Sequence, residues 1–313
     1  MTRNSLSGKL VAVVGGSGFI GRHLAQELLA RGARLRVISR NVERGAGVKP
    51  LGNLGQVQLL RGDVRKAEAL APLLAGADAV VNLAGTFAGD LDAVMGSGAG
   101  AVATAAHAAG VGALVHVSAI GTDAGGETAY ARAKAAGEAA VLAAFPTATV
   151  LRPSVLFGPD DAFINRFAGL IASLPALPVF APGAEFQPVY VDDVALAIAN
   201  ALTDPAAHGG KTYELAGPER VTMAALNRRI ARAAHRKPCF VDMPDALSGL
   251  FVALTGWLPG APISGQQWKL LKAGNVASGA LPGLDALGVA ARPLELFLDR
   301  WLVRFRNHGR FGD

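Results

Sequence analysis

The chain has 313 residues, 51% of them hydrophobic but only 6% aromatic, and a net charge of +6. This length allows one large α/β domain with a smaller lobe, and the excess of Ala, Val and Leu favours helices packed on a parallel sheet over an all-β barrel. The basic residues are spread out rather than clustered with aromatics, which argues against a nucleic-acid groove. The single cysteine, Cys239, excludes an internal disulfide framework and indicates a reducing compartment; we expect it to be a small buried hydrophobe.

Strand-like and helix-like segments alternate through the first half of the sequence. Strands are predicted at 9–16, 34–39, 57–63, 78–85, 113–119 and 148–154, and helices at 21–32, 66–76, 99–110 and 129–145. Strands separated by helices in this way predict an α/β fold with a doubly wound parallel sheet. After Pro159 this rhythm breaks, and then a helix at 189–202 and a strand at 211–217 are expected to return to the main sheet.

The segment VVGGSGFIGRHL lies between the first strand and the first helix. Gly15 would permit the tight turn, Gly18 the close approach of a pyrophosphate, and Gly21 the close packing of the helix on the sheet. The helix N-terminus supplies free N–H groups and a partial positive charge for the anion. The location of these glycines between the first strand and the first helix disfavours the alternative of a merely glycine-rich turn. The expected cofactor-binding residues of this loop are Gly15, Ser17, Gly18, Phe19, Ile20 and Gly21.

These features predict a dinucleotide-binding Rossmann domain. We expect it to span 1–158, with 186–217 returning to it. A smaller C-terminal substrate lobe and tail would comprise 159–185 and 218–313.

The end of the second strand bears on the choice of coenzyme. An NAD site usually has an acidic side chain there, whereas this chain has Ser39 and Arg40. A guanidinium suits the 2′-phosphate of NADP(H), so NADP(H) is favoured. The alternative is that Arg40 is a solvated surface residue, in which case NAD(H) remains an alternative coenzyme. Further cofactor contacts are expected after the third and fourth strands, from Asp63 and Val64 at the adenine and from Leu83, Ala84 and Gly85 along the cofactor backbone.

A tyrosine and a lysine lie one helical turn apart, at Tyr130 and Lys134. An ammonium near a phenol favours the phenolate and so lowers the phenol's pKa. Tyr130 could then act as general acid or base toward a carbonyl or alcohol, and Lys134 could also bind the nicotinamide ribose. The alternative is an accidental pair on an Ala-rich helix. It is disfavoured because the pair directly follows the fifth strand, where the reactive ring should lie.

The motifs GGSGFIG, NLAG, HVSA, YARAK and RPSVLFGP, in this order, resemble the extended short-chain dehydrogenase/reductase superfamily over nearly the whole chain. The resemblance implies an NAD(P)-dependent oxidoreductase, epimerase or dehydratase acting on a sugar nucleotide or a small hydrophobic carbonyl compound. It also implies that Pro153, Ser154 and Val155 run past the nicotinamide amide.

Three segments within 145–296 read FPTATVLRPSVLFGPDDAFINRFA, QPVYVDDVALAIANAL and LPGLDALGVAARPLEL. They are similar, more narrowly, to the NADPH-binding accessory subunit of respiratory complex I and its bacterial relatives. That likeness implies a tightly held NADPH with low or no turnover. It implies complex I or the membrane periphery as partner. We therefore expect a cytoplasmic protein, peripheral at the inner face of the membrane.

The catalytic pattern is incomplete. Catalytic members usually read Ser-Ser or Ser-Thr after the fifth strand, whereas this chain has Ser118 and Ala119. Ser118 corresponds to the first of these residues, which tends to face away from the reacting carbon, and Thr122 is a candidate substitute from the loop. MGSGA (95–99) stands where the enzymes often show Asn-Val-x-Gly-Thr. Losing an oxyanion donor costs about two to three decades of rate but leaves cofactor binding unaffected.

The C-terminal segment 298–311 combines arginines with Trp301 and Phe305. Such a segment can rest on an anionic membrane or a partner subunit, or can be a solvated helix with one packed face. The apolar run 246–258 is too short to cross a bilayer and could cover a substrate pocket or dock on a membrane complex.

The histidines lack metal-ligand spacing, so no metal site is expected, and His116 is read as a hydrogen-bonded core residue. A dinucleotide-sensing regulator that binds other proteins is a third, weaker hypothesis.

Overall fold

The computed structural model describes residues 5–249, 265–307 and 309. These residues form two compact units. Unit 1 comprises the described residues up to Pro153 together with Val191–Leu215 and Ser278–Ala290. Unit 2 comprises the described residues of Ser154–Tyr190, of Ala216–Ala277 and of the chain from Ala291 onward.

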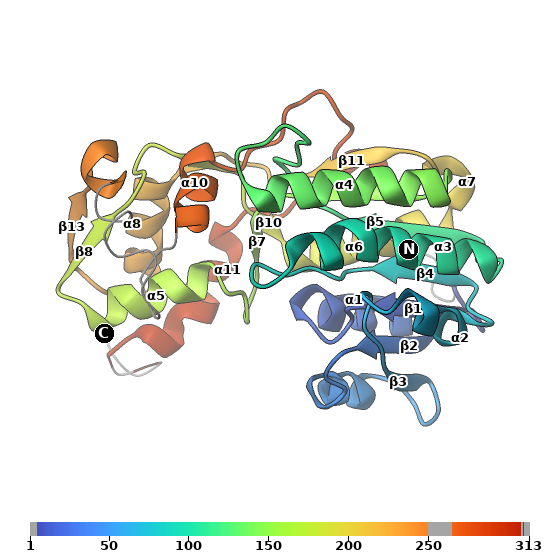
Figure 1. The fold of residues 1–313 in the computed structure, drawn as a ribbon. Helices are drawn as coiled ribbons and strands as arrows, with labels where there is room; N and C mark the ends of the chain where they lie inside the picture. The colour runs from blue at the N-terminus through green and yellow to red at the C-terminus, as the bar shows by residue number, and fades with distance from the viewer. Residues whose placement is uncertain (1–4, 250–264, 308, 310–313) are drawn as a thin grey trace. The chain divides into compact units, whose positions relative to one another are not determined.

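Unit 1 is built on a parallel sheet with the strand order β11-β6-β5-β4-β1-β2-β3, seven strands among the described residues (Figure 1). The order reverses between β1 and β4, which pair directly from Val11 opposite Ala79 to Val14 opposite Asn82. At such a switch point the loops after the two strands diverge and leave room for a ligand at the carboxyl edge of the sheet. The predicted doubly wound α/β sheet is confirmed. Its strands are β1 Leu10–Val14, β2 Arg34–Ser39, β3 Val57–Arg61, β4 Ala79–Asn82, β5 Ala113–Val117, β6 Thr149–Pro153 and β11 Thr212–Leu215.

Helices connect these strands. The α-helices of unit 1 are α1 Phe19–Ala30, α2 Leu70–Leu74, α3 Ser97–Ala108, α4 Ala129–Ala144, α6 Val191–Thr203 and α7 Pro205–His208. Short 3-10 segments are η1 Glu43–Leu51, η2 Ala67–Ala69 and η4 Asp285–Leu287, and η3 Asp92–Gly96 is a π-helix. The helix predicted at 66–76 is shorter than expected. Pro72 has no N–H and is tolerated only in a first helical turn, so the α-helix begins at Leu70.

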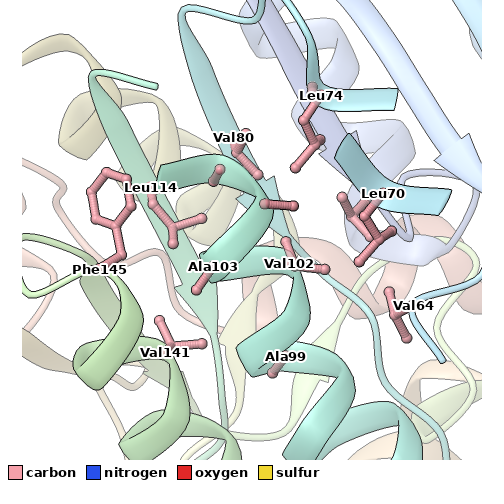
Figure 2. Close-up of a cluster of buried hydrophobic side chains, with 14 of the residues drawn as sticks. Val64, Leu70, Leu74, Val80, Ala99, Val102, Ala103, Leu114, Val141 and Phe145 are labelled. Carbon is pink, nitrogen blue, oxygen red and sulfur yellow. The ribbon is translucent and has the colours of Figure 1, made fainter. Parts of the chain in front are cut away.

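The core on one face of the sheet lies between the strands and α2, α3 and α4 (Figure 2). Leu114 and Val80 from the strands meet Val102 and Val141 from α3 and α4. Small residues let these helices approach closely, because a Cβ on Gly100 would lie only 2.8 Å from the Cβ of Ala140. The Ala-rich composition is therefore the packing surface of two adjacent helices.

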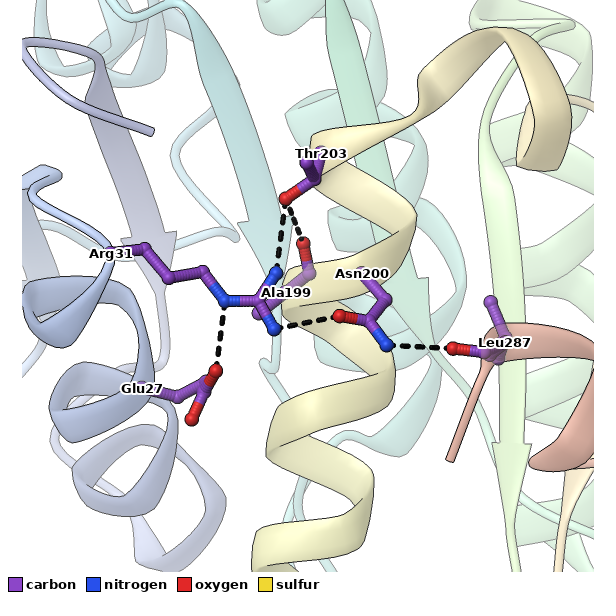
Figure 3. Close-up of polar contacts among 6 residues, drawn as sticks. All are labelled: Glu27, Arg31, Ala199, Asn200, Thr203 and Leu287. Atoms are coloured by element: carbon purple, nitrogen blue, oxygen red, sulfur yellow. Dashed lines mark hydrogen bonds and ion pairs between the residues drawn. The ribbon is translucent and has the colours of Figure 1, made fainter. Parts of the chain in front are cut away.

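The other face of the sheet carries α1, since right-handed crossovers on the two sides of the switch point place their helices on opposite faces. α1 packs against α6. The buried guanidinium of Arg31 joins the two, donating to Glu27 at 2.8 Å, to Asn200 Oδ1 at 2.7 Å and to Thr203 Oγ1 at 3.0 Å (Figure 3).

The segment 278–290 also belongs to unit 1, although the sequence placed it in the smaller lobe. Asn200 Nδ2 donates to the Leu287 carbonyl at 2.7 Å (Figure 3). The Glu214 amide donates to the Pro282 carbonyl, and Glu214 Oε2 accepts from Ser278. These bonds are made by irregular backbone, and for that reason no strand or helix pattern in the sequence marked the segment.

Unit 2 consists of short paired strands and a few helices. β8 Ala176–Val179 pairs with β13 Cys239–Asp242, β7 Leu156–Phe157 with β10 Val189–Tyr190, and β9 Glu185–Phe186 with β12 Val221–Thr222. Its helices are α5 Ile164–Ser173, α8 Met223–Ala233, α10 Gly265–Ala273, α11 Glu295–Trp301 and the 3-10 turn η5 Leu302–Phe305. Cys239 is exposed at the start of β13, so the expected buried position is wrong. The reason is that β13 belongs to a two-stranded sheet in which most of its residues face solvent.

The aromatic and arginine side chains of the C-terminal segment make several contacts within unit 2. The Trp301 ring stacks on Phe297 at 4.8 Å, and Phe297 stacks on Tyr190 at 4.2 Å. Arg304 donates to the Pro159 carbonyl at 2.8 Å, and Arg306 to the Ala233 carbonyl at 3.1 Å. These contacts favour the interpretation as a helix with one packed face. Parts of the predicted segments 298–311 and 246–258 lie outside the described residues. Over the described ranges, no helix has both the length and the apolar character needed to span a membrane.

Candidate cofactor and catalytic site

The turn after β1 is shaped by glycines. Gly15 has φ +78°, and a Cβ there would lie 2.9 Å from the backbone of Leu83 and Ala84, so the turn rests directly on the end of β4. A Cβ on Gly21 would overlap the carbonyl oxygen of Gly16, so the first turn of α1 lies against the same loop. Gly18 occupies the N-cap of α1 and offers no side chain to cap it. The result is an open helix N-terminus, whose amides and dipole suit an anionic diphosphate.

Charged residues gather at the carboxyl edge of β2 and β3. Arg40 is exposed directly after β2. Asp63 accepts at Oδ1 from the Arg65 Nε at 3.0 Å and at Oδ2 from the Arg65 Nη2 at 2.5 Å. The hydrogen bonds from Arg65, assisted by the charges of Arg65 and Arg40, hold the pKa of Asp63 at about 2. Arg65, which the sequence analysis does not name, thus holds the carboxylate expected at the adenine. The Val64 side chain points into the core, so only its backbone is left to meet an adenine.

The loop after β4 reaches the helix that carries the tyrosine and lysine. The Leu83 amide donates to the Val14 carbonyl at 2.8 Å, and the Ala84 amide to Asn82 Oδ1 at 3.1 Å. A Cβ on Gly85 would lie 4.0 Å from Lys134 Nζ. The structure therefore brings Gly85, one of the residues expected along the cofactor backbone, next to the lysine.

Tyr130 and Lys134 lie in the first two turns of α4, whose N-cap Thr128 accepts from the Ala131 amide at 3.1 Å. Lys134 is buried, and its Nζ donates to the Val117 carbonyl at 3.0 Å. Burial lowers the pKa of Lys134 to about 8, a shift that the nearby charge of Glu138 opposes.

The Tyr130 phenol does not show the expected depression. Burial raises the pKa of Tyr130 to about 12. The reason is that desolvation of the phenolate outweighs a lysine that is itself buried, costly to charge and bonded to a backbone carbonyl. In this state Tyr130 keeps its proton and could act as an acid rather than as a base.

The hydroxyl groups after β5 are already engaged. Thr122 Oγ1 donates its proton to the Ala119 carbonyl at 2.6 Å, so Ser118 Oγ, 3.1 Å from Thr122 Oγ1, must donate to it. Each hydroxyl carries one proton, and both are used within the loop. Thr122 therefore does not replace the hydroxyl that Ala119 lacks. Tyr130 is left as the hydroxyl donor among the predicted catalytic residues.

His116 is confirmed as a hydrogen-bonded core residue. It is 1% exposed, and its Nδ1 lies 3.2 Å from Asn82 Nδ2 across β4 and β5. Burial, together with the charge of Lys134, lowers its pKa to about 3, which keeps the ring neutral. His116 is thus not a base at neutral pH.

The segment expected beside the nicotinamide is divided between the units. Pro153 ends β6 in unit 1, and its carbonyl accepts from the Ile120 amide at 3.0 Å. Ser154 and Val155 belong to unit 2, where Ser154 Oγ donates to the Asn275 carbonyl and the Val155 carbonyl accepts from Val189. The nicotinamide contact of these residues stays a prediction.

Comparison with known proteins identifies the family. Residues 11–216 match the NAD dependent epimerase/dehydratase family. The chain belongs to this family. Members of the family depend on a nicotinamide dinucleotide, and the glycine turn, the open N-terminus of α1 and the β4 loop fit such a cofactor.

Two relatives and one solved structure illustrate its range. The chain is 32% identical to NADH dehydrogenase (ubiquinone) 1 alpha subcomplex subunit 9, mitochondrial, of Rattus norvegicus, over 98% of this chain and 83% of the rat protein. It is 32% identical to the ceramide reductase of Caulobacter vibrioides, over 75% of this chain and 74% of that protein. It shares its fold with the UDP-glucose 4-epimerase of Thermus thermophilus in complex with NAD, with a TM-score of 0.70 and 22% identity over 95% of this chain and 99% of that one.

Proposed function

We propose that the protein is an NADP(H)-binding accessory or assembly protein of respiratory complex I, acting at the membrane periphery with little or no turnover. The observation that carries this proposal is the 32% identity to the rat complex I subunit, which extends over 98% of the chain and so includes the variable C-terminal part. The likeness of the segments within 145–296 to that type of subunit agrees with it.

The cofactor would lie along the carboxyl edge of the sheet. The diphosphate would bind the turn Gly15–Gly21 and the N-terminus of α1, and Arg40 would face the 2′-phosphate of the adenosine ribose. Asp63 and the Val64 backbone would meet the adenine. Lys134, beside Gly85, would bind the nicotinamide ribose. When bound, the nicotinamide supplies or accepts a hydride.

The low turnover follows from what the chain offers to a carbonyl substrate. Ala119 has no hydroxyl, and the hydroxyl groups of Thr122 and Ser118 donate to acceptors within the loop. Tyr130 is a weak acid at its raised pKa. The missing donor alone would reduce the rate about two to three decades. Cofactor binding does not depend on these groups.

A second candidate function is that of an active NADP(H)-dependent reductase acting on a hydrophobic carbonyl compound. The pair of Tyr130 and Lys134 supports it. So does the Caulobacter relative named a ceramide reductase, to which this chain is 32% identical.

Purification from the native host tests both candidates. The first expects NADPH to copurify at near-stoichiometric amounts and the protein to migrate with complex I in a native gel. The second expects oxidation of NADPH by an oxidised ceramide that carries a ketone, lost in Tyr130→Phe. Protein that carries no nucleotide and migrates apart from complex I contradicts the first proposal.

A further inference from the structure

Phe87 is an exposed aromatic residue beside the predicted catalytic tyrosine. Its side chain is 72% exposed, although the neighbouring Leu83 and Ala84 are partly buried. Among the exposed large hydrophobic residues of the described chain, Phe87 is the one aromatic. Its ring lies on the ring of Tyr130, with the centroids 4.8 Å apart and the planes 11° from parallel. One ring face is therefore held by Tyr130 while much of the rest meets solvent.

The segment that carries Phe87 is a small turn between two glycines. Thr86 Oγ1 donates to the Ala88 carbonyl at 2.8 Å and lies 3.1 Å from the Ala88 amide, which closes the turn. Gly85 precedes this turn, and Gly89, with φ +75° and open space around its Cβ position, follows it. The turn can move as a unit on these two residues, because glycine accepts backbone angles on both sides of φ zero.

The same segment follows β4, at the carboxyl edge where the reactive end of a dinucleotide is expected. Gly85 lies next to Lys134, and Phe87 lies on Tyr130. A ring stacked on a phenol removes solvent from one of its faces and occupies the space that a substrate would need there.

We propose that Phe87 determines access to Tyr130: its ring caps the phenol ring, and an apolar carbonyl compound reaches Tyr130 only by displacing Phe87 through rotation of the turn between Gly85 and Gly89. The role given to Tyr130 rests on the second candidate function, that of an active reductase, whereas the cap itself is a property of the chain without cofactor. A flat apolar cap also defines the occupant that can replace it, a compound with an apolar face rather than a charged one.

The test uses the reactivity of the tyrosines in the full-length protein. The chain has three tyrosines, Tyr130, Tyr190 and Tyr213, so each can be followed in its own peptide. Tetranitromethane nitrates phenolates, and the rate at pH 8 is measured by mass spectrometry in the wild type and in Phe87→Ala. We expect the Tyr130 peptide to react faster in the variant, about tenfold for each unit by which exposure lowers the pKa of Tyr130 from about 12 toward 10.

Three controls make the result specific. Phe87→Trp keeps an aromatic face over Tyr130 and should react at the wild-type rate. Leu54→Ala removes another exposed apolar side chain and should change nothing. Tyr190 and Tyr213, buried at 7% and 2% exposure, should nitrate at unchanged low rates in all proteins.

Equal Tyr130 rates in the wild type and Phe87→Ala would overturn the proposal, and so would an equal rise at all three tyrosines, since that indicates general loosening. Calorimetry with NADP⁺ and NAD⁺ on the same proteins tests cofactor binding independently of the role of Phe87. No heat with the wild type contradicts the proposed function, while the nitration rates still decide the role of Phe87.

Discussion

At the scale of single residues, Lys134 carries an electrostatic cost that an apolar side chain would avoid. It is 5% exposed, and its pKa of about 8 lies below the ordinary value of 10.5 because charging it requires desolvation. Between these two values the unfolded chain binds more protons than the folded one, so stability rises as the pH rises through this window. Below pH 8 the full cost is present. Packing does not explain a lysine at this position, whereas the proposed contact with a cofactor would.

Replacing this lysine should stabilise the protein. We expect Lys134→Met to raise the free energy of unfolding at pH 7 by about 1–3 kcal/mol, since each pKa unit corresponds to about 1.4 kcal/mol. The gain should shrink toward pH 10.5, where the wild-type lysine is neutral in the folded state and half neutral in the unfolded one. Urea unfolding at the two pH values measures the difference. Lys9→Met, at an exposed position, is the matched control with an effect near zero. An equal gain at both pH values would argue against a buried charge.

Arg40 tests the choice of coenzyme. In Arg40→Asp the guanidinium that would face the 2′-phosphate becomes a carboxylate, so NADP(H) should lose at least about tenfold in affinity while NAD(H) keeps or gains affinity. Titration calorimetry with both coenzymes gives the ratio. Arg34→Asp makes the same charge change at the other end of β2 and should leave the ratio unchanged. Equal losses for both coenzymes in Arg40→Asp would refute the assignment of Arg40.

At the scale of elements, the position of α4 depends on one glycine. A Cβ on Gly137 would overlap the carbonyl oxygen of Met95 in the π-helix η3, so the backbones of α4 and η3 touch. π-Helical turns are frequent at functional sites, and this one supports the helix that carries Tyr130 and Lys134. The closeness of the two backbones sets where that pair lies relative to the β4 loop.

Gly137→Ala should therefore destabilise the protein, although alanine normally favours a helix over glycine by about 1 kcal/mol. We expect a loss of about 1–3 kcal/mol in urea unfolding, the usual cost of overpacking. Gly169→Ala in α5 is the matched control, because its Cβ would lie 3.9 Å from the Phe305 ring, an ordinary contact. That variant should be neutral or slightly stabilised. If Gly137→Ala proved as stable as the wild type, α4 and η3 would have room to separate.

Elements with a regular pattern were predictable, and contacts between irregular segments were not. The strands and most helices of unit 1 followed from apolar runs and their spacing, and the glycine turn followed from its place after β1. Arg65 could have been suspected from its position two residues after Asp63, but its bidentate bond through Nε and Nη2 needs the backbone geometry of that turn. The Phe87 stack and the engagement of Thr122 depend on loop conformations, which no periodicity encodes.

The pKa of Tyr130 was mispredicted for a related reason. Spacing along a helix shows that Lys134 is near, but it does not show how deeply either group is buried. Burial decides the sign here, because both groups lose water on folding. Sequence patterns thus predicted which of these side chains lie near one another better than they predicted their pKa values.

At the scale of the whole molecule, unit 1 is assembled from three separate stretches of the chain. The last of them, 278–290, follows most of the unit 2 segments in the sequence. It is held by hydrogen bonds that continue from Arg31 through Asn200 to the Leu287 carbonyl (Figure 3). Arg31 thereby links α1, which follows the glycine turn Gly15–Gly21, to a segment that lies far later in the sequence. Removing this guanidinium should loosen the late segment.

In Arg31→Met, Asn200 Oδ1 and Glu27 lose the donor that they share, at a cost of about 1–3 kcal/mol in the free energy of unfolding. Hydrogen exchange should show the local effect, with faster exchange at the amides of Gly288 and Val289, which close the turn at 284–289. Arg34→Met removes an exposed arginine at the start of β2 and should leave both measurements unchanged. If the segment 278–290 exchanged at the wild-type rate in Arg31→Met, its attachment would depend on Glu214 and Ser278 instead, and the late segment would be anchored to β11 alone.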